Sequence, residues 1–364
     1  MRIGIDVRAA CSPKRTGKGQ WTYRFIDELL TRGKALTLYT DAALPEAWQR
    51  IVDGSGGDIQ AVHLSFQGLR WHLETAKRLK RNADKLDAYV SPVSYIVPAF
   101  VGKMLPVIPV VHDLIAFRNE PHDRKATFIE KLTLGRAMNN AAAVCTISDA
   151  TSKDLLARYP RLPMSRVHPI YAGTSWEQTI VRDPLPANIL SIGTLCPRKN
   201  QLRLIQAFAS LPSPLREQAT LTLVGGRGWN DDEIVKLAKE TSGVTWHDYL
   251  PDEECARLLS RCTVFALPSL YEGFGLTVLD AMAQGVPVLT SDRGSLAEVA
   301  GAAALMCDPE DVAAIREGLV KLLTDGQLRT SLAIAGPKQA LKYSWKNTVD
   351  RFQQTLADID KGAL

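Results

Sequence analysis

The sequence predicts a two-domain α/β protein in which each domain is a parallel β-sheet covered by helices on both faces. Three observations lead to this fold class. The chain has 364 residues, enough for two cores. Apolar runs of strand length alternate with amphipathic helical stretches almost throughout. The alternation also starts again after a proline-containing segment near the middle. Continuous apolar strands are typical of sheets buried on both faces by helices.

The predicted strands are short apolar runs separated by helical stretches. In the first half they are Ile3–Val7, Leu36–Tyr39, Ala61–Leu64, Ala88–Val90, Pro106–Val111 and Ala142–Ile147, and in the second half Ile189–Ile192, Leu221–Val224, Val244–Trp246, Val264–Leu267 and Val286–Leu289. Trp176–Asn188 (WEQTIVRDPLPAN) has two prolines, mixed charge and no periodicity, which indicates a linker. We therefore expect Rossmann-like domains at residues 1–180 and 186–343. In such sheets ligands bind beyond the carboxyl ends of the strands, so we expect an active site in the cleft between the domains.

Composition indicates a soluble protein: 46% of residues are hydrophobic and 23% are charged. No run approaches the roughly 18 apolar residues of a membrane span, and the chain begins directly with the strand-like RIGIDVR, so we expect a cytoplasmic location. The six cysteines are scattered without a CxxC pair, which favours reduced core residues over disulfides or zinc ligands.

The charge is shared unevenly between the two halves. Residues 1–183 hold 26 Lys and Arg against 18 Asp and Glu, a net +8, whereas the remainder is −3. A basic first half indicates an anionic partner, such as phosphate groups or a membrane surface. An ordinary solvated surface explains the same numbers equally well.

Two common nucleotide-binding motifs are absent. No GxxxxGK[ST] occurs, and in LVGGRGWN the third glycine position of a GxGxxG would be Asp231. A P-loop NTPase and a dehydrogenase are therefore not expected.

Two polar segments of the first half carry candidate site residues. In RTGKGQW, residues 15–21, Gly17 and Gly19 precede a predicted helix, Thr22–Leu30, where the backbone can approach an anion closely. A plain loop leading into a helix is the alternative. In VVHDL, His112 follows a buried strand and is expected at the ligand edge of the sheet, although a lone His is more often structural.

The segment SIGTLCPRKN, residues 191–200, follows the first strand of the second domain. Arg198 and Lys199 open the predicted helix Gln201–Ser210, and two cations at a helix N-terminus suit a pyrophosphate. The alternative is a solvated charge pair, but the helix dipole disfavours cations there. As surface positions, they are expected to change stability by less than about 0.5 kcal/mol when replaced.

The segment LPSLYEGFGLTVLDAMAQGVPVL, residues 267–289, leaves a strand, turns, and enters a helix. Glu272 lies on the turn, and Asp280 lies about one turn inside the helix. Two acids so placed can accept hydrogen bonds from sugar and ribose hydroxyls. The amides of Gly273–Leu276 can face phosphate or sugar oxygens.

These segments resemble the retaining glycosyltransferases of family 4, which have the GT-B fold of two Rossmann-like domains facing across a cleft. PSLYEGFG-x-x-x-L-D-A-M-A-x-G-V-P-V is similar to the acid-x7-acid motif of that family. GTLCPRKN resembles its phosphate-binding strand end, in the version found in many enzymes that use GDP-mannose. HDL, ISDATSKDLL and RTGKGQW match as well, so the resemblance covers nearly the whole chain.

The resemblance implies a role for each candidate residue. Glu272 would contact the transferred sugar, Asp280 the ribose, and His112 the donor sugar, while Arg198 and Lys199 would neutralise the leaving diphosphate. The remaining predicted donor-binding residues are Gly17, Gly19, Gly193, Gly273, Phe274, Gly275 and Leu276. Three positions depart from the family: Asp280 is usually Glu, Thr277 replaces a common proline, and Thr194 stands where many relatives carry Arg.

The resemblance also implies the reaction and the partners. The acceptor hydroxyl of a glycan or a lipid-linked sugar would attack from the face that the nucleotide leaves, with retention and without metal or cofactor. The one DxD, Asp358-Ile-Asp360, suits a solvated helix end. The final helix, Ser344–Asp360, would return to the N-terminal domain, making 344–364 part of it. A role in polysaccharide or glycolipid synthesis is implied, and nucleic acid is not an expected partner.

Several alternatives remain open. The fold also suits an epimerase or a phosphorylase, and the departures at Thr194 and Asp280 leave room for a protein that binds a nucleotide sugar without turnover. The basic segment Arg70–Lys85 (RWHLETAKRLKRNADK) is predicted to be a surface helix that touches an anionic membrane, or else simply a solvated helix.

Overall fold

The computed structural model describes residues 1–13, 15–118, 124–174 and 181–362. These residues fall into two compact units. Unit 1 contains the described residues of Met1–Phe117, Arg124–Gly173 and Trp345–Leu364. Unit 2 contains Arg118 and the described residues of Thr174–Ser344. The N-terminal part of the predicted linker, residues 176–180, lies outside the described residues.

The sheet of unit 1 has seven parallel strands in the order β3-β2-β1-β4-β5-β6-β7. Their bounds are β1 Ile3–Asp6, β2 Leu36–Thr40, β3 Ile59–His63, β4 Ala88–Ser91, β5 Val107–Val111, β6 Val144–Thr146 and β7 Val167–Pro169. β1 lies inside the sheet, where Ile3 is opposite Leu36 on one side and Ala88 on the other. It is buried along its whole length, which explains its unbroken apolar run.

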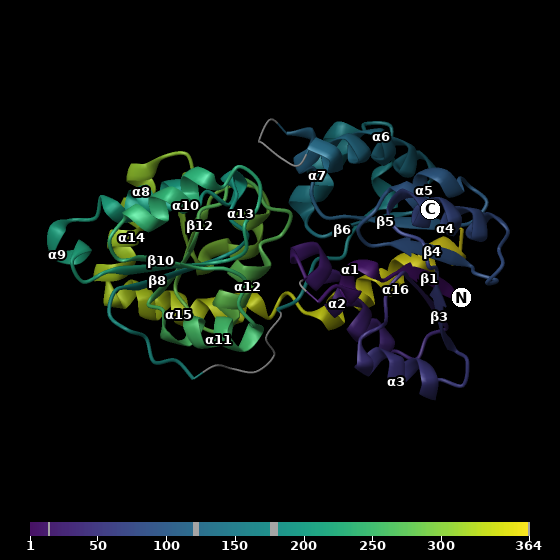
Figure 1. Ribbon diagram of the computed structural model, residues 1–364, viewed down its shortest axis with the longest axis horizontal. Helices are drawn as coiled ribbons and strands as arrows, with labels where there is room; N and C mark the ends of the chain where they lie inside the picture. The colour runs from purple at the N-terminus through teal and green to yellow at the C-terminus, as the bar shows by residue number, and fades with distance from the viewer. Residues whose placement is uncertain (14, 119–123, 175–180, 363–364) are drawn as a thin grey trace. The chain divides into compact units, whose positions relative to one another are not determined.

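Helices cover both faces of this sheet (Figure 1). They are α1 Arg8–Cys11, α2 Gly17–Leu30, α3 Glu46–Gly54, α4 Gly68–Lys80, α5 Ile96–Val101, η1 Ile115–Phe117, α6 Arg124–Asn140, α7 Asp149–Arg158, η2 Met164–Arg166 and α16 Trp345–Asp360. α4, α5 and α6 pack side by side on one face, and α2 and α16 pack together on the other (Figure 1). Phe352 of α16 meets Phe25 of α2 with ring centroids 5.1 Å apart, so the C-terminal helix belongs to the core of unit 1.

Unit 2 has a second parallel sheet, of six strands in the order β10-β9-β8-β11-β12-β13. The strands are β8 Asn188–Ile192, β9 Thr220–Val224, β10 Val244–His247, β11 Val264–Leu267, β12 Val288–Ser291 and β13 Leu305–Cys307. The helices are η3 Pro197–Lys199, α8 Gln201–Ala209, α9 Ser213–Arg216, α10 Asp232–Glu240, α11 Asp252–Arg261, α12 Leu276–Ala283, α13 Gly294–Ala300, η4 Gly301–Ala303, α14 Val312–Thr324 and α15 Gly326–Ala340. α8, α10 and α14 share one apolar core with the sheet, and α11, α12 and α13 share another, so both faces are covered.

The predicted fold class of two Rossmann-like domains is confirmed, and each predicted strand is present with ends shifted by at most two residues. Two edge strands of three residues each, β7 and β13, were not predicted from the sequence. β7 is only half-buried and ends in Pro169, so it lacks the buried apolar run by which the other strands were recognised. A second difference is that α2 begins at Gly17, five residues before the predicted Thr22.

The strand order of each sheet shows where along its carboxyl edge a ligand would be expected to bind. In unit 1 the chain builds outward in one direction from β1 and then in the other from β4, and in unit 2 the same reversal falls between β8 and β11. The loops that leave two such neighbouring strands diverge, which opens a crevice beyond their carboxyl ends. The two predicted site segments of unit 2 follow β8 and β11, one on each side of this reversal.

Candidate active site

The centre of the candidate site in unit 2 is an ion-paired carboxylate. Arg198, in η3, donates from Nη1 to Oε2 of Glu272 at 2.7 Å and to the carbonyl oxygen of Tyr271 at 2.8 Å. Lys199 Nζ lies 2.7 Å from the other oxygen, Oε1, without the angles of a hydrogen bond. The Glu272 side chain is only 8% exposed, so the three charges interact largely away from water.

The two cations fix the ionisation state of Glu272. Burial raises the pKa of this carboxyl, but the adjoining charges of Arg198 and Lys199 outweigh burial and bring the pKa down to about 2. Glu272 is therefore ionised at neutral pH. One carboxylate beside two cations leaves the cluster with a net positive charge, which favours binding of an anion.

The structure corrects one expectation for the two cations. We expected Arg198 and Lys199 to be surface residues at the start of a helix, but Asn200, with a φ of 63°, separates them from α8. Their side chains fold over Glu272 and are 18% and 14% exposed. The surface exposure on which the expected stability change below about 0.5 kcal/mol was based is therefore wrong, and the size of the change itself stays a prediction.

Three buried residues that the sequence analysis missed hold the two loops in place. Asn200 donates from Nδ2 to the carbonyl oxygens of Pro268 and Pro309, at 2.8 and 2.6 Å, and so ties the loop after β8 to the loops after β11 and β13. Gln201 donates to the carbonyl oxygen of Thr194 at 3.1 Å. Ser295, in α13, donates to the backbone carbonyl oxygen of Glu272 at 2.6 Å. The one feature of the sequence that could have pointed to any of these three residues was the position of Asn200 directly after Lys199.

The turn between β11 and α12 requires glycine at Gly275. This residue precedes α12 with a φ of 99°, and a Cβ there would lie 2.5 Å from Leu296 Cδ2. Gly273 and Phe274 are buried in the same turn, and Phe274 packs edge-on against Tyr343 at 5.4 Å. The turn thus brings the backbone of Gly273–Leu276 next to the Glu272 cluster.

Asp280 lies one turn inside α12 and is 6% exposed. Its Oδ1 accepts a hydrogen bond of 2.8 Å from the hydroxyl of Thr174. The predicted contact of Asp280 with a ribose stays a prediction.

Buried polar atoms without a hydrogen-bond partner gather in this segment. Within the described residues of unit 2 they are Ser269 Oγ, Glu272 Oε1 and Thr277 Oγ1. Buried polar atoms in folded proteins are nearly always paired. Ser269 Oγ and Thr277 Oγ1 have no hydrogen-bond partner, and Glu272 Oε1 has the ion pair with Lys199 alone, so a polar ligand could supply the missing hydrogen bonds in this segment.

The remaining donor-binding candidate of unit 2 is Gly193, at the end of β8. A Cβ at this position would lie 3.3 Å from Lys199 Cε, so glycine leaves room for the Lys199 side chain. The segment LVGGRGWN, which failed as a dinucleotide motif, packs against the same loop: Leu195 N donates to the carbonyl oxygen of Gly226 at 3.0 Å. A Cβ at Gly225 would lie 2.1 Å from the Gly193 oxygen, which explains a glycine there.

His112 lies at the carboxyl end of β5 in unit 1, as predicted, and is 3% exposed. Burial, and next the charge of Lys18, lower its pKa to about 4, so the ring is neutral at pH 7. Nε2 lies 2.7 Å from the carbonyl oxygen of Pro92, an atom that only accepts hydrogen bonds. The proton of the neutral ring is therefore on Nε2, which leaves Nδ1 as an acceptor.

We expected Gly17 and Gly19 in a loop before a helix, but both lie in the first turn of α2. Gly19 has a packing reason to be glycine, because a Cβ there would lie 2.7 Å from the carbonyl oxygen of Ala9. Gly17 has no atom within 4 Å of such a Cβ. Between them, Lys18 forms an ion pair of 3.4 Å with Asp113, which directly follows His112. The glycines and His112 thus lie near one another at the ligand edge of unit 1.

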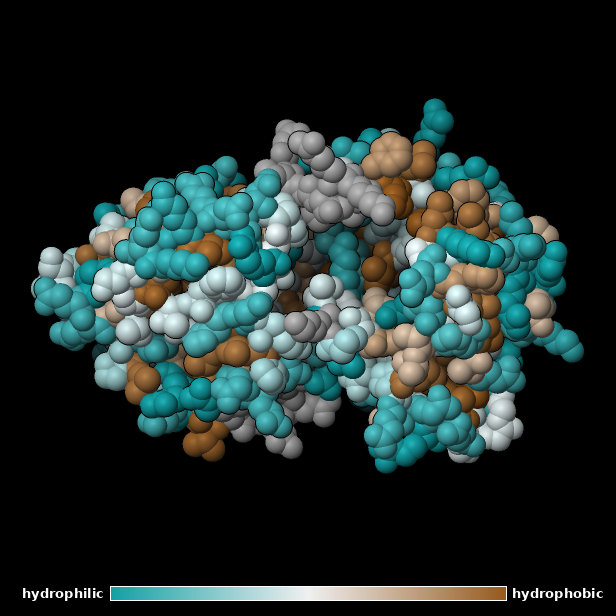
Figure 2. Space-filling view, viewed as in Figure 1, coloured by the Kyte–Doolittle hydropathy of each residue, from teal (hydrophilic) through white to brown (hydrophobic). Residues whose placement is uncertain are grey.

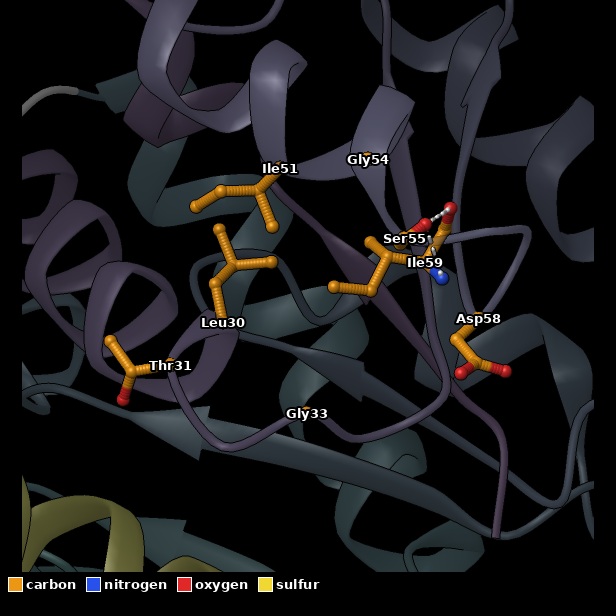
Figure 3. Close-up of a pocket in the computed structure, with 8 residues that line it drawn as sticks. All are labelled: Leu30, Thr31, Gly33, Ile51, Gly54, Ser55, Asp58 and Ile59. Atoms are coloured by element: carbon orange, nitrogen blue, oxygen red, sulfur yellow. Dashed lines mark hydrogen bonds between the residues drawn. The ribbon is translucent and has the colours of Figure 1, made fainter.

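A pocket of about 390 Å³ lies elsewhere in unit 1 (Figure 3). It is lined by Leu30, Thr31, Gly33, Ile51, Gly54, Ser55, Asp58 and Ile59. The pocket adjoins the end of α2 and the start of β3, the amino edge of the sheet, and Asp58 is its one ionisable residue. Its position and lining connect it to none of the candidate residues.

Within the residues that the structure describes, no helix has the length and apolar character of a membrane-spanning segment. In the same part of the chain, no group of three or more His, Cys, Asp or Glu side chains is arranged to hold a metal ion.

Comparison with known proteins identifies two family models that together span most of the chain. The model "Glycosyltransferase Family 4" matches residues 16–177, and "Glycosyl transferases group 1" matches residues 176–339. The chain is 35% identical over 259 residues to an O-antigen chain mannosyltransferase B of Escherichia coli, covering 66% of this chain and 67% of that protein. It is 29% identical over 286 residues to a serotype-specific mannosyltransferase WbdA of Escherichia coli, of which the alignment spans only 34%.

Among solved structures, a sucrose-phosphate synthase from Thermosynechococcus elongatus aligns over the full length of both chains with a TM-score of 0.76. The sequence identity is 19%, so this likeness concerns the fold.

We predict that Glu272 makes the protein sensitive to acid. Its pKa is about 2 in the folded state against 4.5 for an ordinary glutamate, so its stabilising effect is complete above pH 4.5 and lost as the pH falls to 2. The free energy of unfolding should lose about 3 kcal/mol across this range through Glu272 alone. In Glu272→Gln this share of the pH dependence should vanish, as measured by urea unfolding at several pH values.

The matched control is Glu254→Gln, at a 48% exposed glutamate of α11. It should keep the pH dependence of the wild type. An unchanged acid dependence in Glu272→Gln would show that the cations do not depress the pKa of Glu272.

Proposed function

The chain belongs to glycosyltransferase family 4 and has the GT-B fold, and from this premise we propose that it transfers mannose from GDP-mannose to a hydroxyl of a glycan or lipid-linked acceptor, with retention of configuration. The observation that carries the proposal is the ion-paired cluster of Glu272, Arg198 and Lys199, in the same segment as two buried hydroxyl oxygens, Ser269 Oγ and Thr277 Oγ1, that have no hydrogen-bond partner.

The names of the relatives support mannose as the transferred sugar. Both Escherichia coli relatives are mannosyltransferases, and one of them acts on an O-antigen chain. The resemblance of GTLCPRKN to enzymes that use GDP-mannose points the same way. We propose cell-surface polysaccharide or glycolipid synthesis as the setting.

The charges of the cluster suggest how the reaction proceeds. A bound diphosphate offers Arg198 and Lys199 a second anionic partner, and its negative charge grows as the sugar–phosphate bond breaks. The cations then bind the transition state more tightly than the ground state. Glu272, kept ionised, can accept a hydrogen bond from a sugar hydroxyl. The leaving phosphate oxygen takes the proton of the acceptor hydroxyl. Because fixed cations stabilise the leaving group, we propose that transfer needs neither a metal ion nor a cofactor.

A thermal-shift panel followed by a transfer assay tests this function. GDP and GDP-mannose should raise the melting temperature more than UDP and UDP-glucose, because a ligand that binds only the folded state stabilises it. With GDP-mannose and a sugar acceptor, GDP should be released together with a mannosylated product, and the rate should be unchanged in excess EDTA.

Other outcomes would indicate a different donor, a different activity or a need for metal. Protection by UDP alone would overturn the donor assignment. GDP release that requires phosphate in place of an acceptor would indicate a phosphorylase, a new sugar nucleotide would indicate an epimerase, and binding without turnover a non-catalytic protein. Loss of transfer in EDTA, restored by Mn²⁺ or Mg²⁺, would overturn metal independence.

Lys199→Ala is expected to lower kcat by about 10²–10³-fold, the effect of losing one donor that stabilises charge in a transition state. Arg198→Ala should lower kcat by a comparable factor, because Thr194, which stands where many relatives carry an arginine, is uncharged and cannot replace the lost cation. Steady-state kinetics give the rates, and melting curves show whether each variant is folded at the assay temperature.

Lys239→Ala, at an exposed lysine of α10, removes the same group from the same unit and should retain wild-type turnover. Near-wild-type turnover in a folded Lys199→Ala variant would remove the assignment of the phosphate site.

We also propose that unit 1 binds an anionic membrane surface. The predicted basic helix is α4, which ends at Lys80, so that Arg81 and Lys85 lie in the turn beyond it. Large hydrophobic side chains are exposed on the three adjacent helices α4, α5 and α6 or directly after them. They are Leu69, Leu73, Phe100, Met104, Phe128 and Leu132, with exposed fractions between 41% and 71%.

Basic residues accompany these hydrophobic side chains. Arg70, Lys77 and Lys80 are exposed on α4, and the Arg136 guanidinium of α6 lies 5.9 Å from the Phe100 ring centroid. Figure 2 shows brown hydrophobic surface in unit 1 among teal hydrophilic side chains. A surface that combines apolar and basic groups matches an anionic bilayer, where each Lys or Arg contributes about 1 kcal/mol.

Sedimentation with vesicles tests the membrane proposal. Binding should be stronger to vesicles of phosphatidylcholine with phosphatidylglycerol than to phosphatidylcholine alone, and it should weaken in the double variant Phe128→Ser, Leu132→Ser. The control is Ile334→Ser, Leu341→Ser, which removes exposed hydrophobic residues from unit 2. Binding that depends on neither anionic lipid nor these side chains would leave only an ordinary solvated surface.

A further inference from the structure

The face of α6 that packs into unit 1 changes from apolar to polar along the helix. Leu134, Ala137 and Met138 are buried in an apolar core shared with α5, β5 and β6. One and two turns earlier on the same face stand Glu130 and Thr127, at the helical spacing of i−4 and i−7 from Leu134. The helix therefore directs a carboxyl and a hydroxyl into positions where the apolar pattern predicts hydrophobic side chains.

Both polar side chains have a buried oxygen without a partner. Within the part of the chain that the structure describes, Thr127 Oγ1 and Glu130 Oε1 receive or donate no hydrogen bond. An unpaired buried oxygen loses its hydration without compensation, so such atoms are rare in folded proteins. Thr127 and Glu130 are less than one helical turn apart. Their two unpaired oxygens therefore either lower the stability of the fold without any function, or they form hydrogen bonds with a ligand.

Charged groups from neighbouring elements surround Glu130. Burial raises its pKa to about 7, while Lys18 of α2 lowers the pKa and Asp113 after β5 raises it. Tyr159, after α7, is a further neighbour, since Glu130 raises its pKa in turn. The same Lys18 and Asp113 act on the pKa of His112. Glu130 thus lies in one electrostatic neighbourhood with the predicted sugar contact, at the ligand edge of the unit 1 sheet.

We propose that Thr127 and Glu130 form a binding subsite for a hydroxyl group of the sugar acceptor, next to the Lys18–Asp113 ion pair. The proposal rests on the proposed transferase function and adds to it the residues that select the acceptor. Nothing in the reaction of the donor uses Glu130, so its role is to bind and orient the acceptor.

The charges favour a neutral hydroxylated ligand over an anionic one. Among the described residues whose charges act on the pKa of Glu130, Asp113 is negative and Lys18 is positive, and Lys18 is already paired with Asp113 at 3.4 Å. A phosphate of a lipid-linked acceptor would meet a net negative neighbourhood. A sugar hydroxyl, in contrast, can donate to Glu130 and accept from Thr127 at the same time.

Kinetics with two substrates test this subsite. The donor is GDP-mannose, and the acceptor is whichever octyl glycoside of mannose, glucose, galactose or N-acetylglucosamine is mannosylated fastest. In Glu130→Gln we expect KM for the acceptor to rise by about tenfold to a hundredfold, the loss expected for a hydrogen bond to a charged group. Hydrolysis of GDP-mannose without acceptor should be unchanged. kcat/KM for the acceptor should increase through pH 7 in the wild type and lose this step in Glu130→Gln.

Thr127→Val, which removes only the hydroxyl, should also raise the acceptor KM, and it carries the test if Glu130→Gln fails to fold. We expect Glu130→Gln to melt no lower than the wild type at pH 8, because the neutral amide avoids burying a charge. Glu46→Gln, at an exposed glutamate of α3, is the control and should match the wild type throughout.

The outcomes separate the subsite from the function it rests on. A wild-type protein that neither hydrolyses nor transfers from GDP-mannose contradicts the proposed function. Active wild-type protein with unchanged acceptor KM in both variants overturns the subsite alone. Hydrolysis of GDP-mannose without transfer to any of the glycosides overturns the assignment of the subsite to a sugar hydroxyl.

Discussion

The arrangement of the candidate site depends on one buried interaction, the pairing of the Glu272 carboxylate with Arg198 and Lys199. A carboxylate that is 8% exposed remains charged only because two cations compensate for its lost hydration. The cations in turn are drawn inward from the position that a helix start would have given them. Asn200 and Ser295 hold the backbone on both sides, so the charges meet in a fixed geometry before any ligand arrives. Such preorganisation lowers the cost of stabilising a charge that develops during a reaction.

Much of this was predictable because it follows from local patterns. Strands buried on both faces leave continuous apolar runs, and parallel strands place their carboxyl ends at one edge, so the loops after β8 and β11 were correctly expected to carry the polar residues. The acid-x7-acid segment and the basic pair were therefore identified before the structure. β7 and β13 were missed because each has only three residues and is partly exposed, which leaves no such run.

The contacts between these segments could not be predicted in the same way. Arg198 and Glu272 are 74 residues apart, and no periodicity shows that their side chains meet. Asn200, in the left-handed conformation, separates η3, which carries both cations, from α8, and no local pattern predicted that both cations would turn inward onto Glu272. At Gly17 the predicted start of the helix was wrong, since two glycines suggested a loop where α2 has already begun. In each case long-range packing overrode a local preference.

The mutual dependence of the three charges restricts how this site can change during evolution. Loss of Glu272 would leave two cations close together without a counter-ion, and loss of either cation would leave the carboxylate underpaired in a poorly hydrated position. Each single step therefore passes through an intermediate of lower stability, whereas a simultaneous change of charge on both loops does not. We expect the residues at these positions to vary together or not at all among descendants of a common ancestor. The chemistry of the site would thus be inherited as a unit, while the surrounding surfaces diverge.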